Sequence, residues 1–420
     1  MNVLSKIIKK RKTKDDYFIS LDIGVEVVKA LVLHLDQNED KVYVLGFGSV
    51  QQQVGNMKGS DIQDDSGVIL TCKKAISKAV AMTDVKPKKV IIGINGEFTM
   101  GMAMKMEYQR NDSKSKIDTE EIKDIISTMQ KDILEKIKNK MKKEHDVKKK
   151  IKITSADIVD ISIDGYRVMS PIGFKGSKIE FNMFNSFLYS YRFDIIKKIA
   201  KELQLTLLDV ISESYAVAMS IGAQDNTEFN AILVDVGGKT TNVAIVHDGN
   251  VEDVVTFNIG GRAFTKSLSN ELGISMEEAE KLKIKYSENK VDKDMEGKIK
   301  EIFAYDCDVL FAGIEISLKE FSSSNLLPVQ IILYGGGSQL FHINEIINKP
   351  FLKKDLSFLS KTKIKFVNVD DIINVVDKTD KVKGYQYINS MSLANFVLDS
   401  EDVDSNSVNV ILRDLIRKNY

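Results

Sequence analysis

Tryptophan is absent from the 420 residues of this chain, and proline and cysteine are scarce, with four and two residues. The two cysteines, Cys72 and Cys307, lie far apart in the sequence, which argues against a disulfide framework and suits a reducing compartment. No apolar run reaches the length of about 18 residues that a membrane-spanning helix needs. The basic start is not followed by the apolar segment and cleavage site of a signal peptide. These absences favour a cytosolic protein.

An excess of charge of either sign is also missing, because 60 lysines and arginines balance 60 aspartates and glutamates. Without a net positive field the chain is not expected to bind nucleic acid. Its length exceeds what one hydrophobic core usually fills, so the sequence predicts two or more domains.

The most informative stretch is AILVDVGGKTTNVAIV at 231–246, where two apolar runs typical of strands flank a glycine turn. Glycines let backbone N–H groups approach an anion, and hydroxyl and ammonium groups add further donors. The predicted phosphate contacts in this turn are Gly237, Gly238, Lys239, Thr240 and Thr241. Asp235 carries the same sign as phosphate, so we expect it to bind Mg²⁺, directly or through water. Taken alone, the stretch is also compatible with an ordinary glycine hairpin.

Two further stretches strengthen the nucleotide interpretation. FISLDIGVEVVKALVL at 18–33 repeats the same design with Asp22 and Gly24, and such internal similarity indicates two related halves. Asp22 is accordingly a second candidate ligand of Mg²⁺. IILYGGGSQL at 331–340 is an apolar run leading into a glycine turn, which lets a flat ring or a phosphate lie close to the backbone. The candidate contacts in this turn are Gly335, Gly336, Gly337 and Ser338.

The three motifs together resemble those of the actin-like ATPase superfamily, and within it the chain is most similar to the FtsA family. The likeness includes 259–286, similar to a family pattern GG-x-x-x-T followed by AE-x-x-K, and YRVMSPIGFKGSKIEF at 166–181. It extends from Tyr17 to about Leu398. The resemblance implies an α/β, actin-like (ribonuclease H-like) two-domain fold with duplicated β-sheet cores, an inserted small α+β subdomain, and ATP with Mg²⁺ bound between the domains.

The resemblance and the changes in composition along the chain predict the domain boundaries. From Glu97 to about Asn185 the charge rises and a helical pattern at 115–146 begins at the N-cap candidate Asp118. The predicted units are a basic amphipathic leader (1–16), a first core (17–97 plus 186–225), an inserted subdomain (98–185), a second core (226–270 plus 326–398), a small second subdomain (271–325), a linker (399–406) and a terminal helix (407–420).

Further site residues follow from the resemblance. Glu213 matches by position the residue that orients the attacking water, which makes Glu213 and Asp235 the catalytic candidates; alternatively Glu213 is a carboxylate favoured by a helix N-terminus. The turn at Gly260 and Gly261 is expected to donate N–H groups to phosphate. Glu280 and Lys283 match the pair that holds ribose and base, although such a pair alone is more often an exposed ion pair.

Two residues depart from the family pattern of the second phosphate motif. Lys239 stands where a further glycine is usual, and Asn242 stands where an aspartate is frequent. A lysine there either pairs with phosphate or fills the space needed by the metal and water. We therefore expect ATP to bind and its hydrolysis to be slow or undetectable.

The C-terminal residues form an amphipathic pattern after a polar, acidic linker. Apolar side chains fall on one helical stripe beside basic ones, which combines insertion with attraction to anionic lipid. The stripe resembles the membrane-targeting helix of the FtsA family; the alternative is a helix that packs on its own domain. The predicted membrane contacts are Val408, Ile411, Leu412, Leu415, Ile416, Arg413, Arg417 and Lys418. The basic N-terminal leader is a second candidate, with a disordered leader as its alternative.

The resemblance also implies a function and partners. An FtsA-type protein polymerises at the inner membrane face of the division site, tethers the FtsZ ring by binding the FtsZ C-terminal peptide, and recruits later division proteins. The alternatives are a PilM-like pilus assembly protein, expected to lack a free amphipathic tail, and a small-molecule kinase on the same scaffold. A kinase would need a catalytic base, and no His or Asp outside the phosphate hairpins suggests itself.

Overall fold

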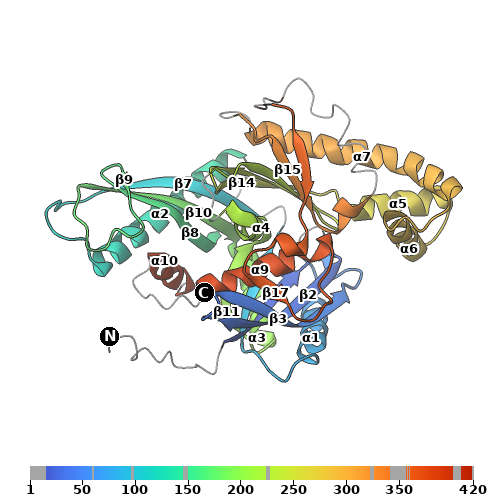
Figure 1. Ribbon diagram of the computed structural model, residues 1–420, viewed down its shortest axis with the longest axis horizontal. Helices are drawn as coiled ribbons and strands as arrows, with labels where there is room; N and C mark the ends of the chain where they lie inside the picture. The colour runs from blue at the N-terminus through green and yellow to red at the C-terminus, as the bar shows by residue number, and fades with distance from the viewer. Residues whose placement is uncertain are drawn as a thin grey trace, which may run out of the picture.

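The computed structural model of the protein describes residues 16–58, 61–95, 99–144, 150–223, 228–321, 326–340, 356, 358, 360–400 and 408–418. The predicted amphipathic leader and most of the predicted linker lie outside these residues. The chain folds into two large sheets with helices on both faces of the first (Figure 1).

The first sheet has the order β11-β6-β1-β2-β3-β17. Strands β6 and β11 run parallel to β1, whereas β1, β2 and β3 form an antiparallel meander. Helices α1 and α3 share one core with this sheet, and α4 and α9 share the other. The elements are β1 (Tyr17–Ile23), β2 (Val27–Asp36), β3 (Lys41–Gln51), β6 (Lys89–Ile94), β11 (Thr206–Ser212), β17 (Val375–Asp377), α1 (Asp65–Val80), α3 (Ser190–Glu202), α4 (Glu213–Ala218) and α9 (Ile388–Ser400), with β4 (Met57–Lys58) and β5 (Asp61–Ile62) as a separate ribbon.

The second sheet repeats the plan of the first. Its central hairpin β12–β13 is followed by β14, and β15 lies parallel to β12 as β6 lies parallel to β1. This repetition confirms the predicted duplicated cores. The full order is β16-β15-β12-β13-β14-β7-β10-β8-β9. The strands of this core are β12 (Ala231–Val236), β13 (Thr241–His247), β14 (Asn250–Phe257), β15 (Gln330–Tyr334) and β16 (Lys363–Phe366).

The inserted subdomain extends this second sheet. β7 (Thr99–Gln109) meets β14 through one register pair, Met102 with Asp253, and continues into β10 (Lys178–Tyr189), β8 (Ile151–Ile163) and β9 (Tyr166–Arg167). Helix α2 (Thr119–Glu144) packs an isoleucine-rich face into the same core. Asp118 accepts a hydrogen bond from the Glu121 N–H at 2.8 Å, which confirms the predicted N-cap.

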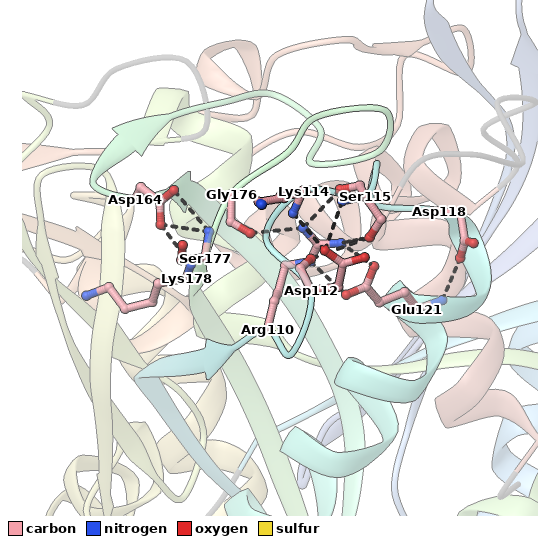
Figure 2. Close-up of polar contacts among 10 residues, drawn as sticks. All are labelled: Arg110, Asp112, Lys114, Ser115, Asp118, Glu121, Asp164, Gly176, Ser177 and Lys178. Carbon is pink, nitrogen blue, oxygen red and sulfur yellow. Dashed lines mark hydrogen bonds and ion pairs between the residues drawn. The ribbon is translucent and has the colours of Figure 1, made fainter.

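A buried arginine organises the loops at one end of this subdomain (Figure 2). The guanidinium of Arg110 makes a two-pronged pair with Glu121, at 2.7 Å and 2.8 Å. It also donates to the carbonyl oxygens of Ser115 and Gly176. The segment from Arg110 to Glu121 and the distant Gly176 are therefore joined at one side chain.

A group of helices packs on the second core. These are α5 (Gly261–Leu272), α6 (Met276–Ser287) and α7 (Lys293–Phe321), which share apolar contacts with β12, β13 and β15. Ser275 and Glu278 form a capping box at the start of α6. Short helical turns complete the chain: η2 (Met219–Ala223), η3 (Gly336–Gln339), η4 (Val369–Asp371) and η5 (Tyr385–Tyr387).

The C-terminal part differs from the predicted grouping. Residues 375–398 were assigned to the second core, yet β17 pairs with β3 and α9 packs on the first sheet. The reason is that α9 is apolar on most sides and fills the space between the first sheet and α4. The last helix, α10 (Val408–Arg417), lies beside α2, β8 and β11 (Figure 1). Among the residues described, no helix has the length and apolar content needed to cross a bilayer.

Candidate functional site

Three buried carboxylates meet where the two sheets face each other. Asp22 lies near the end of β1, Asp235 near the end of β12, and Glu213 opens α4 directly after β11. All three are at most 4% exposed. The two hairpins and the helix start therefore bring together the catalytic and metal-binding candidates of the sequence analysis.

Two asparagines and a serine link these carboxylates. Asn95 Nδ2 donates to Glu213 Oε2 at 2.6 Å and to Asp235 Oδ2 at 3.1 Å. Asn389 Nδ2 does the same at 2.8 Å and 3.0 Å. The next residue, Ser390, donates to Asp22 at 3.0 Å. The first turn of α9 thus contacts both halves of the repeat.

The sequence analysis missed these linking residues. Asn95 directly follows the apolar strand 89–94, and this position was the available signal. Asn389 carries no local signal, because only the packing of α9 across the junction gives it a role.

Lys29 adds a positive charge to the group. It stands opposite Asp22 in the β1–β2 register, and its ammonium lies 2.9 Å from the carboxylate. Burial alone would lower the pKa of Lys29, but the charge and hydrogen bond of Asp22 outweigh it and raise that pKa. Lys29 therefore stays protonated and neutralises Asp22.

The remaining carboxylates hold protons more tightly than usual. Burial raises the pKa of Asp235 to about 6. Burial, followed by the negative charges of Asp22 and Asp235, raises the pKa of Glu213 well above its ordinary value. A bound cation would favour the ionised forms. These three carboxylates do not form a metal-binding group by themselves, so Mg²⁺ there would take its other ligands from water and phosphate.

The second phosphate hairpin touches the first. The Gly237 N–H donates to Thr240 O and closes the turn, while a Cβ on Gly238 would stand 2.4 Å from Glu26 Cγ. Glu26, in the turn after β1, pairs with Arg262 at 2.8 Å and lies 3.8 Å from the Lys239 ammonium. A carboxylate thus lies near Lys239, the cation that was expected to meet phosphate.

Some predicted phosphate donors already have other partners. The N–H groups of Gly261 and Arg262 donate to Gly237 O and Gly238 O at 2.9 Å and 2.7 Å. The Thr241 hydroxyl donates to Ile259 O at 2.7 Å. The hairpin thus uses the Gly261 N–H, one of the groups expected at phosphate, to hold α5.

Glycines are required where the chain segments converge. A Cβ on Gly260 would lie 2.6 Å from Gly237 O. Gly335 adopts φ of 86°, and a Cβ there would stand 2.2 Å from Asp235 Oδ1. The turn at 335–337 consequently lies against the second hairpin. In the first hairpin, a Cβ on Gly24 would stand 2.5 Å from Val27 O.

The predicted ribose and base pair lies beside this convergence. Lys283 donates to Glu280 and Thr265 at 2.7 Å each, and to Gly261 O at 3.0 Å. An added Cβ on Gly261 would lie 3.5 Å from the Lys283 ammonium and 3.8 Å from Gly337 Cα. The Ser338 hydroxyl is buried and donates to Gly335 O, so it shapes the turn.

The predicted membrane residues lie elsewhere. Val408, Ile411, Leu412 and Ile416 are at most 5% exposed and belong to the core of the inserted subdomain. In the structure the C-terminal helix packs on the protein itself, which was the alternative to membrane binding. The physical reason is that α2 and β8 offer an apolar surface that matches the stripe.

Several known proteins with sequences similar to that of this chain are named as cell division proteins. The family model described as cell division protein FtsA matches residues 232–374. The chain is 24% identical over 356 residues to cell division protein FtsA of Neisseria meningitidis serogroup B, covering 80% of this chain and 82% of that protein. It is also 24% identical to cell division protein FtsA of Streptococcus pneumoniae serotype 2, covering 80% and 74%.

Solved structures share the architecture. A structure described as the PilM-PilN type IV pilus biogenesis complex matches with a TM-score of 0.65 and 12% identity, covering 90% of this chain and 98% of that one. The chain is thus similar in sequence to cell division protein FtsA, and it shares its fold with the PilM structure. The sequence matches to the two FtsA proteins cover most of this chain and most of each relative. The likeness to the PilM structure is one of fold alone, since the identity is low.

Proposed function

We propose that this FtsA relative binds ATP with Mg²⁺ at the junction of its two sheets. The observation that supports this most is the meeting of Asp22, Asp235 and Glu213 from two repeated hairpins and a helix start. The chemistry of the donors fits: buried carboxylates suit a hydrated Mg²⁺, Lys239 and Arg262 suit phosphate, and the glycine turn at 335–337 suits a flat ring.

ATP and Mg²⁺ would supply a triphosphate and the cation that neutralises it; the protein supplies orientation. Asp235 and Asp22 would hold the hydrated metal, and Glu213 would orient the attacking water and take a proton from it. Lys239 and Asn242 keep the hydrolysis slow.

Calorimetric titration of the full chain with ATP, with and without Mg²⁺, tests binding. We expect saturable, Mg²⁺-dependent binding that Asp235→Ala weakens, and slow phosphate release. Heat changes no larger than those of buffer, or fast release unaffected by Asp235→Ala, would overturn the proposal.

We further propose that the protein acts in cell division, as the names of its relatives indicate. It polymerises at the inner membrane face, binds the FtsZ C-terminal peptide through the α5–α7 subdomain, and recruits later division proteins. The sequence relatives favour division over pilus assembly, because the PilM likeness concerns the fold. Capture of the full chain by the immobilised FtsZ peptide, with a scrambled peptide as control, tests the partner; equal retention by both would contradict it.

A further inference from the structure

The terminal helix α10 docks on a surface of the protein that is complementary to it, and this surface is called its receptor below. Its apolar stripe is inserted into the core formed by α2, β8 and β10, and Leu412 is fully buried there. This stripe is the surface that would enter a lipid interface. In the docked state the stripe is therefore withheld from lipid.

Polar contacts fix the helix in one register. Asn409 accepts from the Ile158 N–H at 2.7 Å and donates to Ile158 O at 3.2 Å, so its amide pairs with strand β8. Arg413 donates to Asp157 at 2.5 Å and 3.2 Å. Arg417 donates to Leu208 O of β11 at 2.8 Å. The polar partners recur every fourth residue and flank the apolar stripe.

The receptor surface contributes negative charges that face the arginines of α10. Asp157 of β8 and Asp209 of β11 are each 7% exposed, and Arg413 and Arg417 reach them. Burying a carboxylate is costly unless a cation and hydrogen bonds compensate. Two buried carboxylates that face the arginines of one helix indicate a surface shaped to hold that helix.

We propose that this surface is a receptor for the chain's own tail and that it competes with anionic lipid for the same apolar stripe and the same arginines. The inference rests on the membrane tether of the proposed function and adds its regulation: the docked tail is withheld, and its release makes it available. The segment 401–407 keeps the released helix attached to the body, so docking remains an intramolecular equilibrium.

Asn409→Ala in the full chain tests the proposal. It removes both hydrogen bonds to Ile158 while leaving the apolar stripe and the arginines that lipid would meet. We expect several-fold faster amide hydrogen exchange in 408–417 and a several-fold larger fraction that sediments with vesicles of phosphatidylglycerol and phosphatidylcholine. Asp157→Ala, a change on the body side, should act in the same direction. Asp132→Ala is the matched control, because it removes one negative charge from an exposed position of α2.

The possible outcomes test separately the docking of α10 on its receptor and the competition with lipid. Exchange in 408–417 that both variants leave unchanged would overturn the receptor. Faster exchange with equal vesicle binding by wild type and variants would overturn the competition. If exchange rises but none of the proteins sediments with vesicles while FtsZ-peptide and ATP binding persist, the membrane tether itself fails, and with it the regulation proposed here.

Discussion

The carboxyl groups of Asp235 and Glu213 are tuned by burial more than by proximity to charge. Asp235 accepts from three asparagine amides, those of Asn95, Asn242 and Asn389, and its pKa still rises to about 6 because the carboxyl group is buried. Hydrogen bonds to the ionised form thus compensate only part of the desolvation. The carboxylate is held ready for a cation at a cost in stability.

We expect Asp235→Asn to stabilise the protein in the absence of nucleotide. The folded pKa of about 6 lies above the ordinary 3.8, so ionisation costs stability progressively as the pH rises through this window. At pH 7.5 the cost is up to about 3 kcal/mol. The variant should therefore melt at a higher temperature at pH 7.5 and at a similar one at pH 4. Mg²⁺-ATP should no longer raise its Tm; a retained shift would contradict the assigned role.

His247 gives a loss of stability in the same direction, at higher pH. A hydrogen bond of 2.8 Å between His247 Nδ1 and the carboxylate of Glu252 raises the pKa of His247, against the effect of burial. A raised pKa contributes stability below the ordinary value of 6.5, and this is lost as the pH rises through the folded value. Denaturation at pH 6 and pH 8 should show that Glu252→Gln removes this loss, amounting to less than about 1 kcal/mol. An unchanged pH dependence would exclude the pair as its source.

At the scale of elements, the loops at one end of the inserted subdomain depend on the ion pair of Arg110 with Glu121. Arg110 is 5% exposed and holds the loop at 112–118, the start of α2 and Gly176 (Figure 2). Asp112 and Asp164 cap neighbouring backbone N–H groups, and these bonds lower the pKa of both carboxyls. The loops at this end of the subdomain are thus ordered by polar contacts.

Arg110→Ala should destabilise this subdomain by about 3 kcal/mol, because it leaves Glu121 and two carbonyl groups without their partner. Limited proteolysis should then cut first within 110–118. Arg167→Ala is the control, since its pair with Asp160 is 62% and 40% exposed and should contribute little. Equal sensitivity of the two variants would contradict this account.

The sequence predicts those elements whose residues form a recognisable local pattern. The hairpins around Asp22 and Asp235, the glycine turn at 335–337 and the N-cap at Asp118 all combine special residues with strand or helix periodicity, and the structure places them as expected. The position of α9 was not predictable, because its apolar residues are spread around the helix and define no single face that would choose between the two sheets. The tail was ambiguous for a related reason: an amphipathic stripe suits lipid or protein equally.

At the scale of the whole molecule, the two halves are joined by charge as well as by packing. Glu26 of the first half pairs with Arg262 and approaches Lys239 of the second. The triphosphate of the proposed function would meet the same cations. Glu26 and phosphate are therefore competitors for one pair of positive charges.

Glu26→Gln should raise the affinity for Mg²⁺-ATP by about two- to five-fold, because a partly exposed ion pair of roughly 0.5–1 kcal/mol no longer has to be broken. Calorimetric titration measures the change. Glu120→Gln, which removes a charge 80% exposed on α2, should leave the affinity unaltered. Weaker binding to the Glu26 variant would mean that this carboxylate assists the nucleotide instead.

The inserted subdomain leaves the first core along the chain but prolongs the sheet of the second, so β14 does not end that sheet. Among the described residues, the outermost strands are then β16 and β9 in one sheet and β17 and β11 in the other, with four, two, three and seven residues. The first three are too short to be good templates for adding a foreign strand, and in β11 the carbonyl oxygen of Leu208 already accepts a hydrogen bond from Arg417 of α10. Assembly of many copies would accordingly use side-chain surfaces, and a polymer built in this way can be taken apart without unzipping any sheet.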